Sequence, residues 1–129
     1  MHTGSCTSTV VIAASDRQGN RASYSNYGTI VDLTAPGGET ATAANGVAST
    51  LNSGTTTPTT PAYVYYQGTS MAAPHVAGLA ALVLSRKAHT PAELEAALKA
   101  GVRPLAGTCS GGCGTGLSDA GKTVASVIV

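Results

Sequence analysis

The 129-residue sequence contains no tryptophan and no phenylalanine, and only 10% of its residues are charged. An ordinary soluble domain carries roughly 25% charged residues. Seven basic and six acidic side chains leave a net charge of +1. The chain therefore lacks the excess of positive charge with which proteins bind nucleic acid or an anionic membrane. The longest apolar run, Val76–Leu84, is about half the length of a bilayer span, and no signal peptide pattern precedes it. We therefore expect a soluble chain without nucleic-acid or membrane partners.

The composition that remains is typical of one domain, or of a piece of one. Hydrophobic residues make up 43% of the chain, enough for a core built from alanine, valine, leucine and isoleucine. No internal repeat and no linker marks a second domain.

Three cysteines are present. Cys109 and Cys113 are separated by one serine and two glycines, a flexible spacing that predicts a short disulfide. A zinc site is the alternative, although it requires four ligands and no histidine follows Cys113. We expect no metal site and no cofactor. Cys6 is left without an intrachain partner, and this suggests that a partner cysteine is missing.

Apolar runs predict a parallel sheet. Val10–Ala14 is rich in β-branched residues, as expected for a strand buried on both faces, and Ile30–Leu33 is a second short run, closed by Pro36–Gly38. The threonine-rich stretch Gly38–Ala62 is expected on the surface. It overlaps a possible hairpin with strands at 47–51 and 63–66, joined around residues 52–54.

Three helices are predicted in the second half of the chain. Met71–Arg86 is almost entirely apolar and is expected to be buried nearly all round. Thr90, Pro91 and Glu93 form a capping box with proline at the first helical position, opening a helix that ends near Gly101. Ser118 or Asp119 is expected to cap a final helix that runs to about Val127.

Ser70 is the candidate nucleophile. It follows Gly68, which permits close approach of a substrate backbone, and it directly precedes the predicted helix. Free backbone amides at a helix start favour developing negative charge, as an acyl-transfer enzyme requires. The alternative is that Ser70 is simply a helix N-cap, a role that serine commonly fills. The local pattern does not decide between the two.

No histidine in the sequence is an evident base for Ser70. Five residues of helix place His75 about 140° around the axis from Ser70, so His75 is interpreted as a packed helix residue. His89 precedes the Thr90 cap, and His2 lies at the N-terminus.

The carboxylates have predominantly structural interpretations. Asp16 lies in a predicted turn, and Asp32 and Glu39 have no catalytic partner. The remaining acids belong to helix starts, namely Glu93, Glu95 and Asp119. Ala72 stands where a GxSxG elbow needs glycine, and no serine is followed three residues later by lysine, which excludes esterase and β-lactamase patterns.

The run GTSMAAPHVAG, Gly68–Gly78, resembles the serine motif of the subtilisin-like peptidases. The resemblance extends over nearly the whole chain, through AASD at 13–16, ASYSNYG at 22–28, DLTAPGG at 32–38 and GLSDA at 116–120. It implies an α/β fold: the C-terminal portion of a three-layer α/β/α subtilisin-like domain with a parallel sheet, incomplete in this chain. Residues 1–129 would be the C-terminal, nucleophile-bearing part of a peptidase catalytic domain.

By this resemblance Ser70 is the nucleophile of a secreted serine endopeptidase, and its own amide helps to form the oxyanion hole. Gly68, Thr69 and Met71 would contact the substrate, with Met71 on the leaving-group side. No DSG, HGTH or AAGN run is found, so the triad aspartate and histidine and the oxyanion asparagine are expected upstream, and the chain alone is expected to be inactive.

The resemblance also implies two kinds of partner: a protein or peptide substrate, and the N-terminal portion of the same catalytic domain. Cys6 would pair with an upstream cysteine, while Cys109 and Cys113 look like the short bridge of some bacterial members. The alternative function is a non-catalytic binding or structural module derived from a truncated peptidase. In either case a sheet edge lacking its neighbours favours assembly or aggregation.

Overall fold

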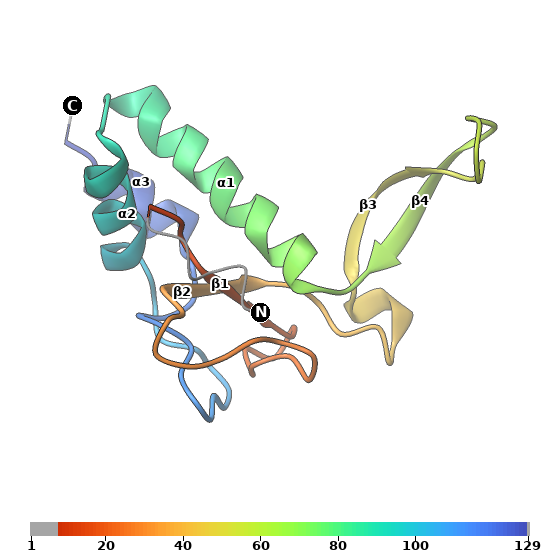
Figure 1. The fold of residues 1–129 in the computed structure, drawn as a ribbon, viewed down its shortest axis with the longest axis horizontal. Helices are drawn as coiled ribbons and strands as arrows, with labels where there is room; N and C mark the ends of the chain where they lie inside the picture. The colour runs from red at the N-terminus through yellow and green to blue at the C-terminus, as the bar shows by residue number, and fades with distance from the viewer. Residues whose placement is uncertain (1–7, 129) are drawn as a thin grey trace.

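The computed structural model describes residues 8–128, which form a mixed α/β arrangement (Figure 1). Helix α1 runs along the β1–β2 pair, with α2 and α3 against it at one end and a β3–β4 hairpin beyond its other end. In chain order the elements are β1 (Ile12–Ser15), β2 (Leu33–Pro36), the 3-10 turn η2 (Ala43–Asn45), β3 (Val47–Asn52), β4 (Pro61–Tyr66), α1 (Thr69–Arg86), α2 (Pro91–Ala100) and α3 (Ala120–Ser126).

Strands β1 and β2 pair in parallel, with Ile12 opposite Leu33, as the buried apolar runs predict. The bounds of the second strand differ from the prediction, because a turn closed by the Val31 amide and the Gly28 carbonyl takes up residues 28–31. The strand therefore begins at Leu33 and ends on Pro36, a position where proline is tolerated. The middle of the pair is completely buried, as expected for a sheet covered on both faces.

The predicted long helix is present and ends at Arg86, but its expected all-round burial is wrong. Five of the nine residues from Val76 to Leu84 are exposed. One face is buried, and it consists of Ala72, Val76, Leu79 and Val83. These residues recur every three or four positions, so they form a single stripe that packs on the parallel strands. The opposite side of α1 has no comparable cover from residues 8–128.

The predicted hairpin is confirmed. Strand β3 pairs with β4 in antiparallel register from Val47 opposite Tyr66 to Asn52 opposite Pro61. The two strands form a separate sheet that extends away from the body of the molecule (Figure 1).

The predicted caps of α2 and α3 are also confirmed. The Thr90 side chain accepts a hydrogen bond from the Glu93 amide while the Glu93 carboxylate accepts one from the Thr90 amide, completing a capping box. Of the two candidates for the final helix, Asp119 is the cap, and its carboxylate accepts a hydrogen bond from the Lys122 amide at 2.9 Å.

A disulfide joins Cys109 to Cys113, as predicted, with their Cα atoms 6.3 Å apart. Both sulfurs are therefore used, and the alternative zinc site is excluded at these cysteines. The bridged loop is tied to the sheet because the Thr34 hydroxyl donates to the Cys113 carbonyl at 2.9 Å. Cys6 and its predicted pairing lie outside the described residues.

Candidate active site

Ser70 is the second residue of α1, and it is exposed. The sequence predicted a helix from Met71 with Ser70 just before it, but the helix begins two residues earlier, at Thr69. Gly68 is the N-cap, with φ 149° and ψ 160°, a conformation that favours glycine. The interpretation of Ser70 as a helix cap is therefore wrong, and its hydroxyl is available for another role.

The first turn of α1 leaves the Ser70 amide available. The amides of Met71 and Ala72 both donate to the Gly68 carbonyl, at 3.0 and 3.3 Å, whereas the Ser70 amide makes no backbone hydrogen bond to any residue of 8–128. Such an unpaired N–H at a helix start is a suitable donor to an anion. Pro74 has no N–H, so the Ser70 carbonyl receives no hydrogen bond from the position four residues on.

The end of the parallel sheet holds the helix start in place. The Gly68 amide donates to the Gly37 carbonyl at 3.0 Å, directly after β2. Gly37 fits because a Cβ there would lie 2.5 Å from the Ala14 Cβ and 2.9 Å from the Gly68 oxygen. The Tyr24 hydroxyl donates to the Gly38 carbonyl at 2.7 Å. Burial raises the pKa of Tyr24, while a backbone hydrogen bond at Gly68 acts in the opposite direction.

Ser70 borders a shallow hollow between the start of α1 and the first half of β3. Its volume is about 330 Å³. The residues that line it are Val47, Ala48, Ser49, Ser70, Met71, Pro74 and His75. None of these is an acid, a lysine or an arginine, so the hollow suits an uncharged group such as a peptide. Of the predicted substrate contacts, Met71 lines the hollow with Ser70, while Gly68 and Thr69 lie beside it in sequence but do not line it.

His75 is exposed, which corrects its interpretation as a packed residue. Its Nδ1 lies 2.7 Å from the Met71 carbonyl oxygen. Because a carbonyl only accepts, Nδ1 carries the proton in this contact. As the helical angle predicts, no hydrogen bond joins His75 to Ser70 within the described part of the chain. The two side chains nevertheless border the same hollow.

The other titratable candidates have structural contacts away from Ser70. His89 Nδ1 contacts the Lys87 carbonyl at 2.8 Å, and His2 lies outside the described residues. The Asp16 carboxylate accepts a hydrogen bond from the Asn20 amide at 2.8 Å within the predicted turn. The Glu39 carboxylate accepts one from the Ser23 amide at 3.0 Å. Among residues 8–128, no three histidine, cysteine, aspartate or glutamate side chains are grouped as metal ligands.

Sequence reasoning missed the contribution of β3 to this site. Val47, Ala48 and Ser49 were placed in a surface stretch with a possible strand, and nothing in that pattern indicates which element the strand faces. Their position beside Ser70 depends on contacts between segments far apart in the chain. The only signal available was the proximity in sequence of the hairpin to the serine.

The fold and the site together define an α/β protein that presents an exposed serine at the start of a helix, as serine hydrolases do. A model of the subtilase family matches residues 2–116, and the chain therefore belongs to that family.

A named relative agrees with this assignment. An "Extracellular protease" of Xanthomonas campestris is 49% identical over 125 residues, which cover 95% of this chain and 20% of that protein. The chain thus spans about a fifth of this relative's length.

Solved structures support the predicted fold class. A protease of Pseudoalteromonas arctica superposes with a TM-score of 0.92 at 48% identity, covering 98% of this chain and 38% of that chain. A cold adapted subtilisin-like serine proteinase superposes with a TM-score of 0.70 at 29% identity, covering 89% of this chain and 37% of that chain. The chain has part of a subtilisin-like α/β fold.

Proposed function

We propose that Ser70 is the nucleophile of a serine endopeptidase, and that residues 1–129 are the C-terminal part of its catalytic domain. The observation that carries this proposal is the exposed Ser70 at a helix start, with an amide that makes no backbone hydrogen bond within residues 8–128. Membership of the subtilase family and the name of the Xanthomonas relative support it.

The proposed chemistry needs two groups from this chain. The Ser70 hydroxyl attacks the carbonyl carbon of the scissile peptide while a histidine, held by an aspartate, takes its proton. The carbonyl oxygen becomes an oxyanion and accepts a hydrogen bond from the Ser70 amide. As the intermediate collapses, the C–N bond breaks and the histidine returns the proton to the leaving amine. Water then hydrolyses the acyl ester and restores the Ser70 hydroxyl. Gly68, Thr69 and Met71 are proposed to contact the substrate around these atoms.

The chain alone is proposed to be nearly inactive. Without a base, Ser70 remains a neutral alcohol and a weak nucleophile. His75 is a histidine that borders the same hollow, but its position about 140° around the helix from Ser70 separates the two side chains, and no hydrogen bond joins them within residues 8–128. The base, its aspartate and a second oxyanion donor are proposed to come from the N-terminal portion of the domain.

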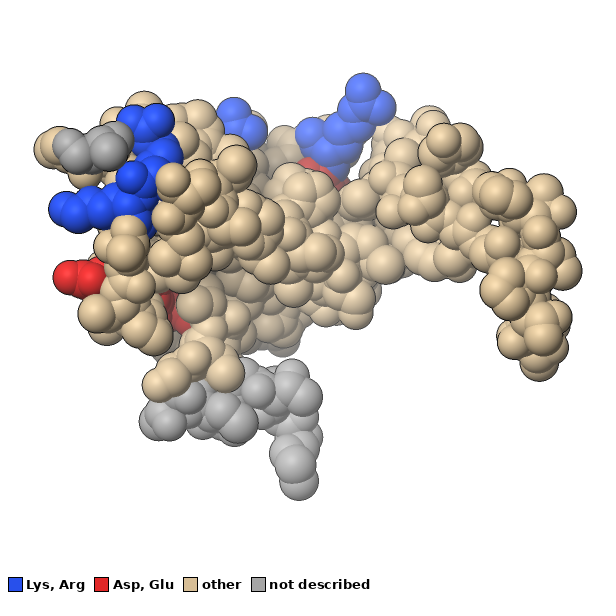
Figure 2. Space-filling view, turned by 90° about the horizontal axis from the view of Figure 1, so that it is seen from above, with Lys and Arg blue, Asp and Glu red and all other residues tan. Residues whose placement is uncertain are grey.

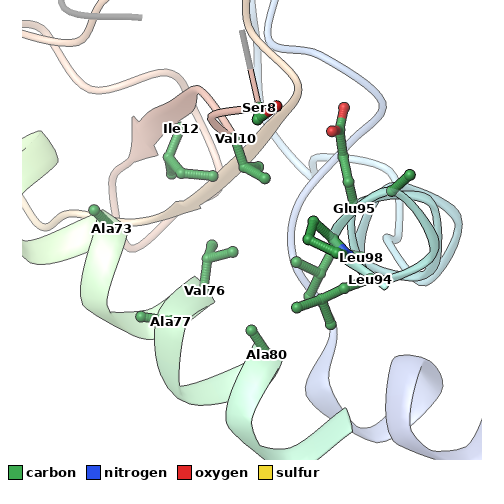
Figure 3. Close-up of a pocket in the computed structure, with 12 residues that line it drawn as sticks. Ser8, Val10, Ile12, Ala73, Val76, Ala77, Ala80, Leu94, Glu95 and Leu98 are labelled. Atoms are coloured by element: carbon green, nitrogen blue, oxygen red, sulfur yellow. The ribbon is translucent and has the colours of Figure 1, made fainter. Parts of the chain in front are cut away.

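An apolar groove supports that assembly. It lies between β1, α1 and α2 and has a volume of about 450 Å³ (Figure 3). Along α1 it exposes small side chains, and opposite them lie Val10, Ile12 and Leu94 (Figure 3). The edge of β1 that faces away from β2 has no strand neighbour among residues 8–128, although near its end the Ala14 amide donates to the Ser25 hydroxyl and the Ala14 carbonyl accepts from the Ala22 amide. The part of this edge before Ala14 is left for pairing with a further strand. We propose that the N-terminal portion of the domain covers this groove and edge.

A secreted parent is proposed on two grounds. The Xanthomonas relative is named an extracellular protease, and the disulfide between Cys109 and Cys113 suits an oxidising compartment. No helix in residues 8–128 is long and apolar enough to cross a membrane.

The test is labelling with a fluorophosphonate probe, which reacts with an activated serine. The chain is incubated alone and after refolding with the N-terminal portion of its domain, with Ser70→Ala as the matched control. We expect labelling of Ser70, and peptide turnover, only in the refolded mixture. Absence of labelling in a mixture that has refolded would remove Ser70 from the mechanism and favour the alternative of a non-catalytic module.

His75→Ala separates the two parts of the proposal. If the chain alone labels rapidly and His75→Ala abolishes the labelling, His75 is a base and the proposed inactivity of the chain is wrong.

A further inference from the structure

Among the described elements, the β3–β4 hairpin contacts mainly the short η2 turn outside its own two strands. Its strands pair only with each other among the described residues, so both outer edges carry unpaired backbone groups. Figure 1 shows the hairpin extending from the body beyond the start of α1. An unpaired two-stranded ribbon of this kind is marginally stable by itself and gains from adding another strand.

Exposed tyrosines gather on the hairpin. The chain has five tyrosines, and three of them lie on β4: Tyr63, Tyr65 and Tyr66 are 86%, 51% and 47% exposed. Tyr63 and Tyr65 are two residues apart on one strand and therefore share a face. Their cross-strand partners are Thr50 and Ala48, which are too small to cover an aromatic ring.

The hairpin also carries no charge. No lysine, arginine, aspartate, glutamate or histidine occurs between residues 40 and 74. Figure 2 shows the consequence, since the hairpin end of the molecule has neither blue nor red atoms while charged side chains gather over the body. Such a surface attracts neither nucleic acid nor an acidic or basic partner, and it favours an uncharged one.

The tyrosine face continues into the hollow beside Ser70. Ala48 lines that hollow and is also the cross-strand partner of Tyr65. A chain leaving the hollow along β3 therefore meets the Tyr65 ring next and the Tyr63 ring two residues later. Strand β3 has six residues, a length of about 20 Å.

We propose that the hairpin is a second binding surface for protein substrates, beyond the hollow that holds the scissile peptide. Its ligand is an extended, uncharged segment of polypeptide, which pairs through its backbone with the free edge of β3 and packs apolar side chains on Tyr63 and Tyr65. Backbone pairing supplies affinity without reading sequence. The aromatic rings add contact area at low conformational cost. This inference rests on the proposed peptidase function.

The proposal predicts that substrate length decides whether the hairpin contributes. A tetrapeptide ending in a chromogenic leaving group extends no further than the hollow, whereas an unfolded protein reaches the hairpin. The complete catalytic domain is therefore compared with its Tyr63→Ala/Tyr65→Ala variant on both substrates. We expect KM for the unfolded protein to rise about tenfold, because aromatic residues commonly anchor interfaces, with kcat and the tetrapeptide kcat/KM unchanged.

Two controls make the comparison specific. Tyr63→Phe/Tyr65→Phe keeps the rings and should behave as the parent. Ile128→Ala removes an 83% exposed apolar side chain at the C-terminal end and should change neither substrate.

Three outcomes would overturn the inference. The first is an unchanged KM for the unfolded protein in a variant that still turns over the tetrapeptide. The second is an equal loss on both substrates by a variant with native circular dichroism, which would make the tyrosines part of the catalytic fold. The third is dissociation of a dimer by the same substitutions, which would assign the face to a second copy. Failure of the proposed function is distinguishable, because the parent domain would then cleave neither substrate.

Discussion

The Lys99 ammonium lies 2.8 Å from Asp32 Oδ1, so that α2 is joined to a residue 67 positions earlier at the start of β2. The other carboxylate oxygen of Asp32 accepts a hydrogen bond at 2.8 Å from the amide of Val11, the residue just before β1. One side chain thus connects a helix with both parallel strands. This relationship gives Asp32, for which the sequence offered no partner, a structural role.

Replacing Asp32 by alanine is expected to destabilise the chain. The Val11 amide would lose its acceptor in a partly buried position, and an unsatisfied buried donor costs about 1–3 kcal/mol. Urea unfolding followed by circular dichroism measures the change. Lys99→Met is the matched control, and it should have the smaller effect because the Val11 contact survives. A larger loss from Lys99→Met would show that the ion pair, and not the backbone contact, is the important part.

The same pair predicts a dependence of stability on alkaline pH. The hydrogen bond and the charge of Asp32 raise the pKa of Lys99 above its ordinary value in the folded chain. A group with a raised folded pKa contributes its stabilisation fully below its unfolded pKa, and loses it as the pH rises through the folded value. The wild-type chain should therefore lose stability above about pH 10.5 by more than Lys99→Met does. Parallel unfolding curves between about pH 9 and 12 provide the test, and identical losses would contradict it.

Gly37→Ala is expected to disturb Ser70, the proposed nucleophile. An added Cβ would lie 2.5 Å from the Ala14 Cβ and 2.9 Å from the Gly68 oxygen, so the link from β2 to the start of α1 must shift. We expect a loss of stability of about 1–3 kcal/mol and slower probe labelling of Ser70 in the assembled domain. Gly78→Ala is the matched control, since no atom lies within 4 Å of the new Cβ. It should stabilise α1 by about 0.5–1 kcal/mol. An unimpaired Gly37→Ala domain would refute the role given to this link.

The disulfide predicts the number of free thiols. Alkylation under denaturing, non-reducing conditions should modify one cysteine per chain, Cys6, and three should react after reduction. Because Cys109 and Cys113 close only a short loop, reduction should lower the free energy of unfolding by about 2 kcal/mol at most. Modification of all three cysteines in unreduced material would show that the bridge is absent.

Features governed by neighbouring residues could be predicted from the sequence. The α2 capping box depends on Thr90 and Glu93, three positions apart, and the parallel strands follow from short β-branched runs. For the capping box and the strands, the physical cause lies within a few residues of its effect. The family resemblance of the Gly68–Gly78 run indicated Ser70 as the candidate nucleophile, and this assignment stays a prediction.

Features governed by distant contacts could not be predicted. The apolar sequence of α1 indicated burial on every side, because composition cannot show how many neighbours are present to cover a helix. The second strand was placed too early, since the turn closed by Val31 and Gly28 uses residues that look like strand formers. The approach of β3 to Ser70, and of Lys99 to Asp32, required the three-dimensional arrangement.

The hydrogen bond from the Gly68 amide to the Gly37 carbonyl has a consequence for how this region tolerates change in length. This hydrogen bond holds the start of α1 against the end of β2, and the whole hairpin lies in the chain segment between the two bonded glycines. Insertions or deletions at the exposed hairpin tip, residues 53–60, should therefore change only the length of the hairpin and should not move Ser70. The hairpin tip is therefore a suitable position for grafting a foreign recognition segment without altering the position of Ser70.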